Sequence, residues 1–208
     1  TDIDGNVYPT VLIGDQCWTA ANLKAAHYND GSEIPNVTNN TDWRFLNTGA
    51  WCNYENNTGL GATYGKLYNW FAAVDPRGIC PLGWHVPTDA EWKLLESALG
   101  VPAAELNNAG VRGEAQNVGG KMKAQTLWNA PNGGATNESG FSGLPGGARD
   151  GFSSGAFYSL GDYGNWWTTT DYGQFNYGWY RRLSYFNTGV HRTGYYKRNG
   201  HCIRCLRD

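Results

Sequence analysis

The residues best suited to chemistry or recognition crowd the C-terminal stretch from 178 to 205. It reads GWYRRLSYFNTGVHRTGYYKRNGHCIRC and is dense in Tyr, Arg, Asn and Gly, in a chain of which only 16% of residues are charged. Aromatic and guanidinium groups supply rigid contact area, stacking faces and forked hydrogen-bond donors, as a recognition surface requires. The same residue types are also ordinary strand residues, so the elements that carry them decide which interpretation holds.

Cysteine chemistry is a second possibility. The five cysteines are Cys17, Cys52, Cys80, Cys202 and Cys205, and only the last two are close in sequence, in the motif CIRC. A C-x-x-C pair can indicate a redox or zinc site. No second pair and no histidine at metal-ligand spacing accompanies it, so one or two disulfides formed in an oxidising compartment are the better interpretation. The odd count leaves at least one thiol unpaired.

Other catalytic patterns find no support. His27, His85, His191 and His201 lie in unlike contexts, and GLPGG lacks the following lysine and helix of a phosphate loop. We interpret His85, in the segment GWHVP, as a structural histidine. The chain is therefore expected to be a non-enzyme without a cofactor or a metal site.

Composition restricts the partners. The 208 residues are 40% hydrophobic and 14% aromatic, enough for a packed core, and no linker or repeat divides them, so we expect one domain over residues 1–208. A net charge of -2 provides no basic field for a phosphate backbone, which argues against nucleic acid. No apolar run approaches the roughly 20 residues of a membrane span.

The order of helical and strand-like segments predicts a segregated α+β fold. Apolar residues recur every three or four positions within Thr63–Asp75, which predicts an amphipathic helix. A second helix is expected to start at the capping box of Thr88 and Glu91 and to end at Gly100. Its buried stripe would be Trp92, Leu95 and Leu99. Short strands separated by Gly, Asn and Asp turns are predicted within residues 141–150, 156–161, 165–171, 178–186 and 201–208.

Side chains alternate between two faces along the strand predicted from Trp179 to Phe186. Trp179 and Leu183 favour the interior, so Arg181 should lie on the inner face with them. The opposite face is then predicted to carry an outward patch of Tyr180, Arg182 and Phe186, joined from the adjoining loop by Asn187, His191, Tyr195, Tyr196 and Arg198.

Several segments, taken in order, resemble the Fibrobacter succinogenes major paralogous domain family. They include DIDGNVYPTVLIGDQCWTAANLK, YGKLYNWFAAV, CPLGWHVPTDAEWKLLESALG, ATNESGFSGLPGGARD, NWWTTTD, WYRRLSY and IRCLRD. The segment GWHVPTDAEW in turn resembles the formylglycine-generating-enzyme branch of the C-type lectin fold. This resemblance implies two helices packed on a small twisted antiparallel sheet with long irregular loops. It also implies that Cys205 is bonded to an upstream cysteine, Cys17 or Cys80, and that Cys202 is free.

The resemblance further implies a ligand-binding face formed by the last strands and loops, at about residues 160–205. Related domains serve as variable proteins of diversity-generating retroelements, and many positions here have the residue types that such mutagenesis yields. The predicted ligand-binding residues are Asn165, Tyr172, Asn176, Tyr180, Arg182, Tyr185, Phe186, Asn187, His191, Tyr195, Tyr196, Arg198 and His201.

Three hypotheses follow for the function. The first is a display domain of a secreted or cell-surface protein, lipoprotein or phage, which binds a protein or carbohydrate ligand on another cell or surface. The second is a structural unit of a larger surface protein. The third is a copper or thiol oxidase that uses CIRC, although in the enzymes the cysteine pair precedes the final strand, whereas here it is expected within that strand.

Overall fold

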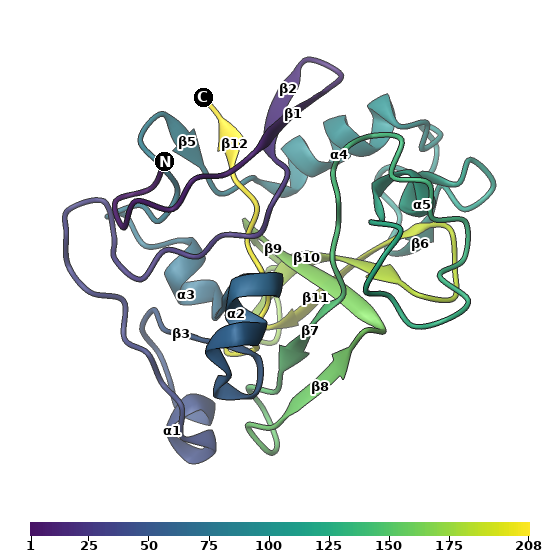
Figure 1. Cartoon of the computed structure of the whole chain (residues 1–208). Helices are drawn as coiled ribbons and strands as arrows, with labels where there is room; N and C mark the ends of the chain where they lie inside the picture. The colour runs from purple at the N-terminus through teal and green to yellow at the C-terminus, as the bar shows by residue number, and fades with distance from the viewer.

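The centre of the molecule is a four-stranded antiparallel sheet in the computed structural model, which describes all of residues 1–208 (Figure 1). β10 pairs with β9 on one side and with β11 on the other, and β11 pairs in turn with the short strand β6. The sheet is built from β6 (Gly110–Arg112), β9 (Tyr163–Asp171), β10 (Tyr177–Ser184) and β11 (Val190–Tyr196).

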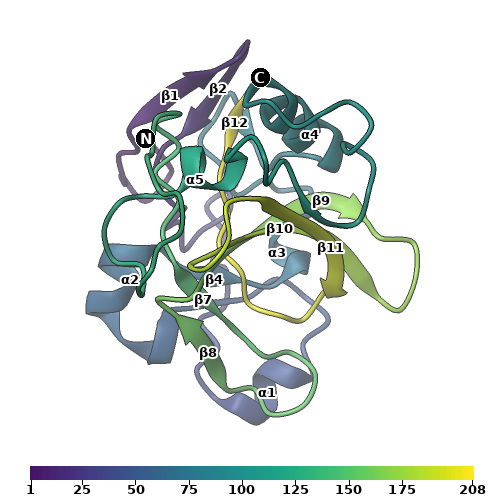
Figure 2. The ribbon, with the colours of Figure 1, turned by 90° about the vertical axis from the view of Figure 1, so that its right-hand side faces the viewer.

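A second four-stranded sheet joins the two ends of the chain. Its order is β1-β2-β12-β5, so the last strand lies between an N-terminal hairpin and β5. Both termini consequently lie at the same end of the molecule (Figures 1 and 2). The strands are β1 (Thr10–Ile13), β2 (Gln16–Thr19), β5 (Trp84–His85) and β12 (Leu206–Arg207). Two further ribbons pair β3 (Trp51–Cys52) with β4 (Leu67–Tyr68) and β7 (Gly146–Arg149) with β8 (Phe157–Leu160).

The helices are short, and only α4 (Asp89–Ala98) exceeds seven residues. The capping box of Thr88 and Glu91 is confirmed, because each side chain bonds to the backbone N–H of the other residue. In Figure 2, α4 lies on one side of the central sheet and the β7–β8 hairpin on the other. The remaining helices are α1 (Asn40–Arg44), α2 (Thr58–Tyr64), α3 (Trp70–Ala73), α5 (Val118–Met122) and a 3-10 turn at Tyr54–Asn56. The fold is thus mixed α/β with small antiparallel sheets.

The single helix predicted over Thr63–Asp75 is wrong. Gly65 ends α2 with a φ of 80°, where a Cβ would lie 2.6 Å from the Cβ of Asn22. The chain then forms β4, and the side chain of Asn69 caps α3 by accepting a hydrogen bond from the N–H of Ala72. The apolar period of the sequence therefore reflects burial of three separate short elements rather than one helical face.

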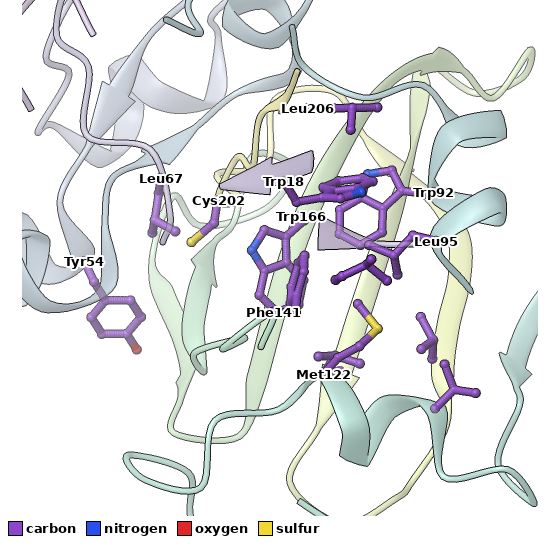
Figure 3. Close-up of a cluster of buried hydrophobic side chains, with 14 of the residues drawn as sticks. Trp18, Tyr54, Leu67, Trp92, Leu95, Met122, Phe141, Trp166, Cys202 and Leu206 are labelled. Atoms are coloured by element: carbon purple, nitrogen blue, oxygen red, sulfur yellow. The ribbon is translucent and has the colours of Figure 1, made fainter. Parts of the chain in front are cut away.

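Aromatic side chains fill the space between α4, the central sheet and β2. Figure 3 shows Trp18, Trp92, Phe141 and Trp166 packed together, each without exposed surface. The rings of Trp18 and Trp92 lie 4.9 Å apart and those of Phe141 and Trp166 lie 5.6 Å apart, both edge to face. Removal of one such side chain costs about 3–5 kcal/mol in protein cores, so this cluster stabilises α4 against the sheet.

The segment from Asn199 to Leu206 crosses the interior, and all eight of its residues are buried. Its backbone pairs with β7 at Gly200, with β4 at His201 and with the free edge of β9 at Cys202. The strand predicted over residues 201–208 is therefore reduced to Leu206–Arg207. This segment also lies outside any display surface, contrary to the prediction that residues 160–205 form one.

The cysteine predictions are confirmed at three positions. Cys205 forms a disulfide with Cys80, which ties the buried C-terminal segment to the turn before β5. Cys202 is free and fully buried, and burial raises the pKa of its thiol to about 12. The two cysteines of CIRC are thus not each other's partners.

Candidate functional site

A buried ion network fixes the central sheet against α4. Asp89 accepts two hydrogen bonds of 2.8 Å from Arg192 on β11, and its carboxylate also lies 2.8 Å from the guanidinium of Arg181 on β10. Glu96, about two helical turns further along α4, pairs with Arg181 and, at 2.7 Å, with Arg112 on β6. All five side chains are buried. Such a network makes the positions of three adjacent strands depend on one helix.

The predicted alternation along β10 is correct for the inner face. Arg181 and Leu183 are buried on the side of α4, while Arg182 lies on the opposite side of the sheet. The register sets Arg182 opposite Asn165 on β9 and His191 on β11. These three residues therefore share the face that the sequence assigned to ligand binding.

Part of that face is nevertheless covered, so the outward patch is wrong at Tyr180. Tyr180, Asn165 and His201 retain 3% of their surface or less. The reason is the buried C-terminal segment, whose His201 ring lies 4.9 Å from Tyr180 and 4.4 Å from Trp167. On the same face, Asn165 donates a hydrogen bond to the carbonyl of Gly147 on β7. These three residues hold the structure together and are not available to a ligand.

Exposed aromatic rings gather instead at one end of the central sheet. Phe152 stacks on Tyr196 at 4.4 Å between ring centroids, Tyr196 lies 4.6 Å from Tyr177, and Tyr177 lies 5.6 Å from Phe175. Phe152 is 61% exposed and Phe175 is 72% exposed. We call this set the aromatic cluster; its members are Phe152, Tyr172, Phe175, Tyr177, Tyr195 and Tyr196.

Three local sets of contacts hold the aromatic cluster in place. The carboxylate of Asp150 accepts backbone N–H bonds from Phe152, Ser153 and Ser154, which folds the loop that presents Phe152. In the turn between β9 and β10, Asp171 accepts a hydrogen bond from the N–H of Gly173. The ring of Tyr172 packs on Trp179 at 4.5 Å, over Gly194, where any Cβ would overlap the tyrosine ring.

The remaining predicted residues do not form a single patch. Tyr185, Phe186 and Asn187 lie in the turn between β10 and β11, at the opposite end of β10 from the aromatic cluster. An eight-residue strand spans roughly 25 Å, so one compact ligand group cannot touch both ends. Arg198 is half-buried and donates a hydrogen bond to the carbonyl of Leu46. The predicted residues that belong to or adjoin the aromatic cluster are Tyr172, Asn176, Tyr195 and Tyr196.

Sequence reasoning missed Phe152, Phe175 and Tyr177. Phe152 stands in DGFSSG and Phe175 in DYGQFNYG, both surrounded by turn-forming residues. A phenylalanine inside a polar turn has no strand or helix face to bury it, and this signal could have identified both residues.

The structure contains no group of three or more His, Cys, Asp or Glu residues placed to hold a metal ion. His85 fills the structural role predicted for it, because its two ring nitrogens bond to Asp208 and Glu91 at 2.6 and 2.9 Å. No helix is both long and apolar enough to cross a bilayer. What the geometry offers is a group of partly exposed aromatic rings in mutual contact at one end of the central sheet.

A model of the Fibrobacter succinogenes major domain matches residues 11–207, which is nearly the whole chain. The chain belongs to this family. Searches of curated proteins and of solved structures gave no match. In this major domain, the matched region includes α4, the ion network and the whole aromatic cluster. The family description names no activity.

Proposed function

We propose that this major domain is a ligand-binding domain and that the aromatic cluster contacts the ligand. The observation that carries the proposal is the exposure of Phe152 and Phe175 at the ends of a continuous series of aromatic rings in contact. Apolar rings exposed as a contiguous group cost solvation free energy and mark interaction sites in soluble proteins.

A protein ligand fits this surface better than a carbohydrate. The two most exposed rings of the aromatic cluster are phenylalanines, which cannot donate hydrogen bonds to sugar hydroxyls. Tyr195 is 37% exposed beside them and supplies a large amphipathic side chain with few rotatable bonds. Tyrosine is also enriched among the residues that dominate the affinity of protein interfaces.

The architecture supports a C-type lectin-like assignment within the proposal. One capped helix packs on a twisted antiparallel sheet, and irregular loops carry the exposed rings. The Cys80–Cys205 disulfide supports a secreted or cell-surface location, because disulfides persist in oxidising compartments.

Diversification by a retroelement is the narrower form of the proposal. Among the residues with suitable types, those with access to solvent include Asn176, Arg182, Tyr195 and Tyr196. The buried Asn165, Tyr180, His201 and Cys202 would not alter a ligand contact directly. A search of the encoding genome for a near-copy of the 3′ end that differs only at adenines, beside a reverse transcriptase, tests this point. Without such a copy, diversification is rejected while ligand binding stands.

Binding itself is tested with a panel of purified secreted and surface proteins and a glycan array, probed with the wild-type domain. For each ligand found, affinity is then measured for Phe175→Ala and Tyr196→Ala, with Phe45→Ala as the control, since Phe45 is 67% exposed just after α1 and outside the aromatic cluster. We expect protein ligands whose affinity falls at least about tenfold in the cluster variants. Binding of glycans alone, or affinities that respond only to Phe45→Ala, would contradict the proposal.

A further inference from the structure

Arg182 is a cation without a partner on the sheet face opposite α4. Its neighbour Arg181 pairs with Asp89 and Glu96, and Arg192 pairs with Asp89. The guanidinium of Arg182 makes no ion pair and no hydrogen bond to any residue of the chain. It lies over the ring of Tyr163, at 4.7 Å from the ring centroid. One flat side of the guanidinium is thus held by an aromatic ring, while its N–H donors, which point outward in the guanidinium plane, stay free.

Unpartnered polar groups surround this arginine. The register places His191 beside it on β11, and the buried Nδ1 of His191 has no hydrogen-bond partner. His201 lies deeper on the same side, and neither of its ring nitrogens has a partner. Orphaned polar atoms are uncommon in folded proteins and call for a reason. Three ring nitrogens without a hydrogen-bond partner therefore lie on the same side of the sheet as the unpaired Arg182.

The neighbouring histidines respond to the uncompensated charge. Burial is the main cause that lowers the pKa of His191 to about 4, and the charges of Arg182 and Arg112 lower it further. Burial and then the charge of Arg182 likewise lower the pKa of His201 to about 3. Both rings are neutral at ordinary pH, so the positive charge on this face comes from Arg182 itself.

From this arrangement we propose that Arg182 receives the carboxylate of an acidic side chain of the protein ligand. The proposal rests on the proposed function and adds the chemical class of one ligand residue. A guanidinium fork matches a carboxylate with two parallel hydrogen bonds, which is the geometry that Arg192 already shows with Asp89 on the other face. Tyr195 of the aromatic cluster lies on the same face as Arg182, four positions from His191 along β11, with the covered Tyr180 between them. A protein ligand that extends over residues 199–206 would place an acidic side chain on Arg182 and apolar side chains on the aromatic cluster.

The proposal is tested first with small probes. N-acetyl-glutamate amide supplies the carboxylate, and N-acetyl-glutamine amide is its neutral match. The ring signals of His191 are followed by NMR at neutral pH, where the carboxyl group of the probe is ionised, during titration with each compound. We expect the glutamate compound to shift these signals, because a bound carboxylate changes the charge beside His191, and we expect Arg182→Gln to abolish the response. An equal response to the glutamine compound, or a response that persists in Arg182→Gln, overturns the proposal. A stronger response to inorganic phosphate also overturns it, by showing a general anion site.

The second test uses a protein ligand found by the binding panel. Arg182→Gln is expected to weaken binding at least tenfold and to reduce its salt dependence, with Arg182→Lys in between and Arg207→Gln as an exposed control. Unfolding curves verify that the variants are folded. If Phe175→Ala weakens binding while Arg182→Gln does not, the carboxylate proposal fails and the proposed function stands. If neither variant weakens binding, both fail.

Discussion

Arg192 of β11 and Asp89 at the start of α4 form a bidentate ion pair in the interior, and both nitrogen–oxygen distances are 2.8 Å. The pair links the strand that carries Tyr195 and Tyr196 to the longest helix. On its other side, the guanidinium of Arg192 lies 3.6 Å from the ring centre of Trp179, which supports Tyr172 of the aromatic cluster. The rigidity of the proposed binding surface therefore depends on a buried charge pair.

Asp89→Asn should destabilise the domain strongly. The substitution leaves Arg192 with an uncharged partner in the interior and Arg181 with Glu96 alone, and loss of one member of a buried pair costs about 3–5 kcal/mol. Glu138→Gln is the control, because Glu138 is exposed and lies 3.6 Å from Lys121, and exposed pairs contribute about 0–1 kcal/mol. Urea unfolding of both variants measures the difference. Equal midpoints would show that the network does not stabilise the fold.

The same carboxylate predicts how stability depends on acid. Burial alone would raise the pKa of Asp89, but the hydrogen bonds and charges of Arg192 and Arg181 outweigh it and lower the pKa from 3.8 to about 2. A lowered carboxyl pKa contributes stability above the unfolded-state value, and this contribution disappears as the pH falls through the folded-state value. Unfolding free energies should therefore decline between pH 3.8 and 2. The decline should be smaller in Asp89→Asn, and an identical decline would assign it to other groups.

Replacement of both Cys80 and Cys205 by serine should lower the unfolding free energy by about 5 kcal/mol in the chain-entropy model. The reason is that the disulfide joins residues 125 positions apart, so its loss frees a large loop in the unfolded chain. Cys17→Ser is the control, since Cys17 is free and only half-buried. Thermal unfolding with and without a reductant measures the effect. A wild-type protein insensitive to the reductant, with a melting temperature equal to that of the double variant, would contradict the pairing.

Tyr180→Ala and Phe175→Ala are expected to separate the core from the surface. Tyr180 packs against Trp167 and His201, and its removal should cost about 3 kcal/mol or more as a core cavity. Phe175 is largely exposed in a turn, and surface changes usually remain within about 0.5 kcal/mol. Unfolding curves of the two variants provide the comparison. Similar losses in both would mean that the aromatic cluster is a part of the core and not a binding surface.

Local signals in the sequence determined α4 and the inner face of β10. The capping box of Thr88 and Glu91 involves residues within one helical turn, and the alternation from Trp179 to Leu183 follows from strand geometry alone. The segments that resemble the major domain family likewise gave the family without any knowledge of contacts. These features depend on residues that are close together in the chain, so the sequence alone predicts them.

Tertiary structure alone decided which side chains of the predicted face are exposed. Tyr180 and Arg182 share one face by alternation, yet the first is buried and the second is not, because residues 199–206 cross the face at Tyr180. The aromatic cluster joins Phe152 to Tyr177 and Tyr196 from three separate segments. Whether a residue is buried depends on which distant segments of the chain pack on it. Alternation along a strand determines only on which side of the sheet the residue lies. The sequence could therefore assign the face, whereas the exposed part of it follows from the path of the C-terminal segment.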